Sequence, residues 1–274
     1  MFYYLIMNIL KRGFFRTFEA IKQHKLLFSL LFLVQLVFVV GVIYFGIVYQ
    51  IKLAQNVQNI MGPLQQANFN STSIQQGQSL LPDMTSDVNS IVLGYQEMVN
   101  NLIQLGLILM GGFLFLNGFI WSVANYMVKK GPFLKYWGKF ILSSLFFLIP
   151  TGLISYITLK SLIGTVSWFQ TGLNVLEISC FILFYFMLIS FSLSEVPLKK
   201  ILPKTFRLGL GDAVWILLSL MFSLILILLS LLLVYVGMGI FSLMIISLLL
   251  LILSLALGKI YLISVISELN TEVF

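Results

Sequence analysis

The side chains in this sequence that have the means to do chemistry are a few polar residues inside long apolar segments. Gln35, Asn117 and Asn125 stand in the middle of such segments, and Glu177 stands about one turn inside the outer end of another. An amide in hydrocarbon needs a hydrogen-bonding partner, so these residues are predicted to form intramembrane polar contacts. A sharper alternative is that Gln35 and Asn117 bind a substrate. For Glu177 the alternatives are a residue at the interface and an acid that faces a cavity.

Groupings of residues typical of catalysis are missing from the sequence. Its one histidine, His24, lies among lysines, and its one cysteine, Cys180, lies in an apolar run. A histidine-based metal site or a Ser-His arrangement therefore has no second component. No two carboxylates lie close together in an apolar segment, which disfavours an aspartyl mechanism. We expect no enzyme, with no catalytic residue, no metal and no cofactor.

The elements that position these side chains are predicted from composition. Hydrophobic residues make up 60% of the chain and charged residues only 9%, whereas a soluble domain carries about 25% charged residues. A helix needs about 20 apolar residues to cross the hydrocarbon core. Segments that meet this requirement cover roughly 27–48, 102–128, 139–159, 174–195, 213–236 and 240–266. The last two are joined by Val236-Gly237-Met238-Gly239, which predicts a tight turn.

Basic residues predict the orientation, because short cytoplasmic loops carry an excess of lysine and arginine. They cluster before the first, third and fifth segments, whereas the opposite side receives only Lys52 and Lys160. We therefore expect both termini on the cytoplasmic side of a cell membrane, with Lys259 reaching the same surface by snorkelling. The clusters flank the spans and so predict contact with anionic headgroups rather than nucleic acid. These predicted lipid contacts are Arg12, Arg16, Lys22, Lys129, Lys130, Lys135, Lys199, Lys200, Lys204 and Arg207.

The three basic clusters share a pattern that suggests an internal repeat. Phe14, Phe15, Phe18 and Ile21 have the spacing of one helix face, and apolar residues within 133–140 repeat it before the third segment. Each cluster is therefore predicted to form a basic amphipathic helix lying in the interface. The chain then reads as a single bundle over 1–274, made of hairpin units at 10–128, 129–196 and 197–274. The alternative is that basic flanks only enforce topology, without a repeat.

Residues 51–101 form the one substantial polar region and are predicted to lie outside. Apolar positions there repeat at intervals of three and four, at Leu53, Val57 and Ile60 and again at Ile91, Tyr95, Met98 and Leu102. This spacing predicts that the first two spans continue outward as a helical hairpin. Its tip carries Asn70-Ser71-Thr72, an acceptor sequence for N-glycosylation at Asn70. The hairpin either packs only on itself or docks a partner.

Taken together, these patterns predict an all-α membrane protein with six transmembrane helices in three hairpins, each preceded by a basic interfacial helix. The favoured function is a permease-like transport component or membrane subunit for apolar, lipidic or uncharged solutes, energised by a separate subunit. The alternative is a scaffold or receptor that recruits a protein partner through the hairpin at 51–101. The repeated layout favours the first, and the apparent lack of charge in the spans favours the second.

Overall fold

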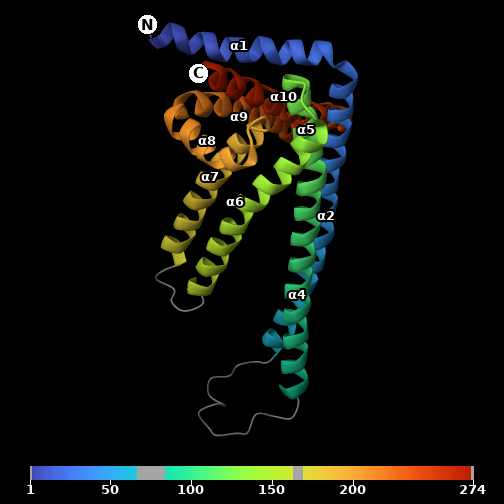
Figure 1. Cartoon of the computed structure of the whole chain (residues 1–274). Coiled ribbons are helices and arrows are strands. Elements are labelled where there is room, and N and C mark those ends of the chain that lie inside the picture. The colour runs from blue at the N-terminus through green and yellow to red at the C-terminus, as the bar shows by residue number, and fades with distance from the viewer. Residues whose placement is uncertain (1, 67–83, 163–168, 273–274) are drawn as a thin grey trace. The chain divides into compact units, whose positions relative to one another are not determined.

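The structure, a computed structural model, describes residues 2–66, 84–162 and 169–272 (Figure 1). Within these ranges every regular element is helical, and six helical stretches are long and apolar enough to cross a membrane. They cover Lys25–Gly62, Asn89–Lys129, Phe133–Tyr156, Asn174–Ser192, Ala213–Val236 and Phe241–Thr271. Over these ranges the prediction of an all-helical chain with six long apolar helices is therefore confirmed. The membrane topology, the hairpin arrangement and the side on which each terminus lies stay predictions.

The contacts divide the chain into two compact units. The arm unit is Phe38–Phe113, and the larger unit combines Met1–Val37 with Leu114–Phe274. The boundaries fall within α2 (Lys25–Gln66) and within η1 (Phe113–Asn117), a single turn of π-helix. This division does not test the three predicted hairpin units, which stay a prediction.

Helix α10 (Phe241–Glu272) forms the centre of the larger unit. Ile252, Ala256, Ile260 and Ile263 of this helix are fully buried. Their burial follows from packing on several sides, against α1 (Phe2–Gln23), α5 (Gly118–Lys129), α7 (Phe169–Ser192) and α9 (Ala213–Val236). Burial of such side chains is the main source of stability where helices pack tightly.

A short 3₁₀ turn, η3 (Gly237–Gly239), joins α9 to α10, as the two glycines predict. A Cβ on Gly237 would lie 3.2 Å from the backbone of Leu243, so the turn leaves little room for a side chain. The two helices also share a buried hydrogen bond between the hydroxyl oxygens of Ser230 and Ser254, which are 2.8 Å apart. Small hydroxyl residues allow this close approach of helices.

Helix α1 has two different apolar faces. Its small residues Gly13, Thr17 and Ala20 are buried, whereas Phe14 and Phe18 are exposed. The small face lies against α10, where Thr17 Oγ1 donates to Ser264 Oγ at 3.2 Å. Helices α1 and α10 lie side by side (Figure 1). An ion pair of 2.7 Å between Arg16 Nη1 and Glu268 Oε1 also joins them. The face with Phe14 and Phe18 points away from α10 and is exposed, as an interfacial helix requires.

Before the third span the structure differs from the predicted separate interfacial helix. Helix α6 (Phe133–Leu162) is continuous from Phe133 into the span, because no residue between them interrupts the helix. Phe140, expected on the lipid-facing side, is buried against Phe191 with ring centroids 4.2 Å apart. By contrast, α8 (Leu198–Gly211) is a separate helix before α9, since Asp212 between them leaves the helical conformation. Asp212 lies at the N-cap of α9, but its side chain makes no capping hydrogen bond.

The arm unit consists of α2 from Phe38 onward and of α4 (Met84–Gly112). Its contact seam differs in part from the predicted one, because Val57, Tyr95 and Leu102 are exposed. Small and polar residues take their place. A Cβ on Gly94 would lie 3.0 Å from Ile60 Cγ1. Because glycine has no side chain, α4 approaches α2 closely at this position. The tip, with Asn70, lies outside the described residues.

The packing of α1 on α10 predicts a strong effect of side-chain volume at Gly13. A Cβ there would lie 2.6 Å from Val265 Cγ2, whereas one on Gly138 of α6 would meet nothing within 4 Å. We expect Gly13→Leu to lower the free energy of unfolding by about 1–3 kcal/mol, because overpacking costs that much. Gly138→Leu is the matched control and should leave thermal stability in detergent unchanged or raised. Equal losses in both variants would contradict the packing of α1 described above.

The predicted orientation has a separate test by cysteine labelling. Gln58 of α2 and Lys135 of α6 are both exposed, and Cys180 is removed first as Cys180→Ser. An impermeant maleimide added to intact cells should label Gln58→Cys and leave Lys135→Cys unlabelled until the membrane is permeabilised. Labelling with the reverse preference would show that the positive-inside assignment is inverted.

Candidate intramembrane polar site

The most unusual side chain of the larger unit is Lys259, in the middle third of α10. Its Nζ donates hydrogen bonds to Gln35 Oε1 of α2 and to Asn117 Oδ1 of η1, both at 2.6 Å. Both amides are buried, at 2% and 6% exposure, whereas the side chain of Lys259 is partly buried. Three segments that are distant in the sequence thus converge on one amine. We call these three residues the lysine–amide cluster.

The lysine–amide cluster lies far from the basic residues that flank the spans. Gln35 follows Lys25 by ten residues along α2, and Asn117 precedes Lys129 by twelve residues in the adjoining helices. At 1.5 Å per residue these separations are roughly 15 and 18 Å. The hydrocarbon core is about 30 Å thick, so the cluster is predicted near its middle where the flanking basic residues mark the membrane surface.

No carboxylate balances the amine of Lys259 within the part of the chain that the structure describes. Glu268, the next acid along α10, is paired with Arg16 instead. In its ammonium form Lys259 has three N–H donors, and the two amide oxygens take two of them. The third donor is suited to an oxygen of a ligand. A carbonyl, carboxylate or phosphate oxygen would complete the set of hydrogen bonds.

The π-helical turn η1 ends at Asn117 and so determines where this amide points. A π-turn contains one more residue per turn than the flanking α-helix, which rotates the following side chains relative to the preceding ones. Such turns are frequent at functional sites.

The hydrogen bonds of Lys259 differ from the expectation from the sequence. The amine of Lys259 is bonded to two amides of other segments instead of extending along α10 toward its end, and both amides lie in segments that the sequence predicts to be mid-span. The reason is that α10 continues as a helix to Glu272, so Lys259 lies farther from its end than the predicted span implied. The sequence did contain a sign of this arrangement, because the oxygens of two buried mid-span amides require a hydrogen-bond donor and Lys259 is able to supply it.

A second polar cluster surrounds the C-terminal end of α7. Asn125 Nδ2 donates to Phe191 O at 3.0 Å, and Lys129 Nζ donates to Ser192 O at 2.6 Å. Lys139 Nζ donates to the carbonyl oxygens of Ser194 and Val196, both at 2.6 Å. The last carbonyls of a helix lack partners within it, and they carry partial negative charge that favours cations. We infer that Asn125 and the two lysines stabilise the end of this span.

The other predicted site residues are dispersed. Glu177 is exposed on α7, and Asn70 lies outside the described residues. Among the predicted lipid contacts, Arg16, Lys129 and Lys204 are partly buried and the others are exposed: Arg12, Lys22, Lys130, Lys135, Lys199, Lys200 and Arg207. Their contact with lipid stays a prediction.

Comparisons of the chain with protein-family models, with curated proteins and with solved structures found no match. Over the described ranges, no three His, Cys, Asp or Glu side chains gather closely enough to hold a metal ion. The lysine–amide cluster is therefore the observation from which a function is proposed.

The lysine–amide cluster predicts a change of sign in a double-mutant cycle. With Lys259 present, Gln35→Leu removes an acceptor from a buried amine and should lower the free energy of unfolding by about 1–3 kcal/mol. In a Lys259→Met background the same substitution removes an unpaired amide, so it should be neutral or stabilising.

Unfolding in detergent micelles measures this coupling. Gln50→Leu, at an exposed position of the same helix α2, is the matched control and should have the same effect in both backgrounds. Additive effects of Gln35→Leu and Lys259→Met would contradict the hydrogen bond between these side chains.

Proposed function

We propose that this protein is a permease-like transport component of a cell membrane for lipidic or otherwise largely apolar solutes that carry an oxygen-bearing polar group. The observation that supports the proposal is the lysine–amide cluster, with an amine that has no described carboxylate partner. In this proposal the third N–H of Lys259 binds the polar group of the solute, and the apolar side chains of the spans surround the remainder.

The cost of the cluster supports a functional role. A lysine at the centre of a span costs about 2.5–3.5 kcal/mol on insertion scales. Replacing a buried polar group and its partners by apolar residues of similar size is often neutral or stabilising. Stability alone therefore does not require Lys259 with Gln35 and Asn117. Ionisable residues at such depth are by default candidates for a substrate or ion pathway.

The chemistry of the cluster limits the class of solute. A cationic amine repels inorganic cations, and the apolar spans, with mean hydropathy up to 3.0, offer few groups to replace a hydration shell. A solute with a carboxylate, phosphate or carbonyl head and an apolar body fits both features. Energy for directional movement comes in this proposal from a separate subunit.

Binding to the purified protein tests the proposal without requiring that subunit. Radiolabelled long-chain fatty acid and lysophosphatidic acid, presented to protein in nanodiscs of neutral lipid, are the probes. Lys259→Met should lower the affinity for at least one probe by about tenfold or more, the loss of one charge-assisted hydrogen bond. Lys52→Met, at an exposed lysine on α2, is the matched control and should bind like the wild type. Equal affinity in all three proteins would contradict the proposed function.

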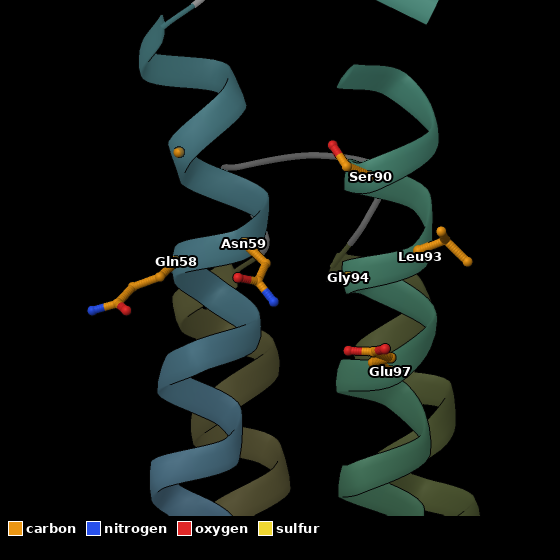
Figure 2. A pocket seen from close by; sticks show the side chains of 7 residues that line it. Gln58, Asn59, Ser90, Leu93, Gly94 and Glu97 are labelled. Atoms are coloured by element: carbon orange, nitrogen blue, oxygen red, sulfur yellow. The ribbon is translucent and has the colours of Figure 1, made fainter. Parts of the chain in front are cut away.

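A second candidate is a scaffold that recruits a protein partner through the arm unit. The observation in its favour is a groove of about 450 Å³ between α2 and α4 (Figure 2). Asn59 projects from α2 toward α4, where Gly94 leaves space, and Ser90 and Glu97 add polar groups. In addition, Asn56 Nδ2 is buried and has no hydrogen-bonding partner among the residues that the structure describes. Exposed polar and apolar groups together are typical of a protein-binding surface.

Deleting residues 54–98 separates the two candidates. The transport proposal expects the truncated protein to retain binding of the lipid probes, since the lysine–amide cluster lies in the larger unit. The scaffold candidate expects loss of proteins that copurify from native membranes. Loss of probe binding with an unchanged melting temperature would contradict the transport proposal.

A further inference from the structure

Helix α8 borders a pocket that no residue of the lysine–amide cluster lines. The pocket measures about 630 Å³ and lies within the larger unit. Residues along one side of α8 and the turn before it form one wall, and Asn270 of α10 contributes to the other. Its volume is within the range of about 300–1,000 Å³ typical of ligand pockets. The lining residues are Val196, Pro197, Lys200, Pro203, Lys204, Arg207, Leu208, Gly211, Asp212 and Asn270.

The charges of the pocket favour an anion. Lys200, Lys204 and Arg207 recur at intervals of four and three residues and therefore share one face of α8. Asp212 is the one acid among the lining residues, so the pocket retains an excess of positive charge. Burial lowers the pKa of Lys204, and the neighbouring charges of Arg207 and Lys200 lower it further, against the opposing effect of Glu195. A bound anion would relieve this repulsion among the cations.

Two other polar residues that line the pocket, Asn270 and Asp212, suit hydroxyl or ammonium donors. Asn270 Oδ1 is buried and has no hydrogen-bonding partner among the described residues. Burial raises the pKa of Asp212, although Arg207 opposes this rise. Asp212 makes no capping hydrogen bond to α9, which leaves its carboxylate available to a ligand. A ligand with a phosphate and an adjoining hydroxyl would bind the cations through its phosphate and donate to Asn270 or Asp212 through its hydroxyl.

The surroundings of the pocket favour a lipid over a soluble anion. Helix α8 is held on α7, where a Cβ on Gly209 would lie 2.6 Å from Phe186 Cε1. Leu198, Phe206 and Leu210 of the same helix are exposed. Exposed apolar residues on a basic amphipathic helix lie in the acyl boundary of a membrane, at the depth where phosphates begin. Val196, Pro197 and Leu208 then supply an apolar wall within the pocket itself.

We propose that the pocket along α8 binds the headgroup of an anionic glycerophospholipid as a specific site, distinct from diffuse attraction to the membrane surface. Lys200, Lys204 and Arg207 hold the phosphate, while Asn270 and Asp212 accept hydrogen bonds from the headgroup hydroxyls. The glycerol backbone lies against the apolar wall. Bound lipid thereby links the turn at 196–197, α8 and the end of α10.

Lipid retention by full-length protein tests this site. Protein in nanodiscs that contain phosphatidylglycerol and phosphatidylcholine is transferred to detergent, and the bound lipid is measured by native mass spectrometry. The wild type should retain phosphatidylglycerol in preference to phosphatidylcholine. Lys204→Gln/Arg207→Gln should reduce the retained phosphatidylglycerol at least tenfold. Lys135→Gln/Lys199→Gln, which removes the same charge from exposed lysines outside the pocket, should reduce it less than twofold.

A second variant leaves the charges intact and fills the pocket. Gly211 lines the pocket, and a Cβ there would meet nothing within 4 Å, so Gly211→Leu is tolerated sterically and occupies the space of the headgroup. It should lower phosphatidylglycerol retention as much as the charge variant, with an unchanged melting temperature.

Three results would overturn the proposal. Equal loss in both double variants would show diffuse electrostatic attraction, and unchanged retention in Gly211→Leu would exclude the pocket as the site. Displacement of lipid by millimolar glycerol 3-phosphate would show that the pocket takes a soluble phosphate. None of these outcomes depends on Lys259, so the test is separate from that of the proposed function.

Discussion

The constraint on which the structure depends is the cost of leaving a polar group without a partner where water is excluded. In water an unpaired amide or amine is solvated, but in hydrocarbon it costs several kcal/mol unless the protein supplies the hydrogen bond. The lysine–amide cluster meets this requirement by bringing Gln35, Asn117 and Lys259 together from three segments. These three residues of the larger unit are thereby held together, since none of the three side chains is satisfied without the others.

The same constraint explains the end of α7. Asn125 and Lys129 donate to its last carbonyls, which the helix itself leaves without donors, and Lys139 donates to carbonyls of the turn that follows. Lys129, which was expected at a lipid surface, therefore also contributes to the internal structure. Where α1 and α10 meet, the pairing of Arg16 with Glu268 similarly neutralises a charge within the protein.

Much of the fold could be predicted from the sequence because it follows from local composition. The six spans are visible as apolar segments of sufficient length, and Gly237 and Gly239 indicate the turn between α9 and α10. Contacts between segments that are distant in the sequence were harder to predict. Gln35 and Asn117 were recognisable as amides that need partners, but Lys259 was identified only by the structure, since its partners lie 142 and 224 residues away. The helix beginning at Phe133 was predicted as two elements, because an amphipathic pattern does not by itself show where a helix is interrupted.

The amine of Lys259 is bonded to two amides in segments that the sequence predicts to be mid-span. Solid-state NMR on the protein in lipid bilayers, with ¹⁵N-labelled lysine and ¹³C-labelled glutamine and asparagine, measures this directly. We expect strong dipolar coupling from one lysine Nζ to one glutamine and one asparagine side-chain carbonyl. This coupling should be absent in Lys259→Met. A Lys259 signal that couples to water and to neither amide would contradict this expectation.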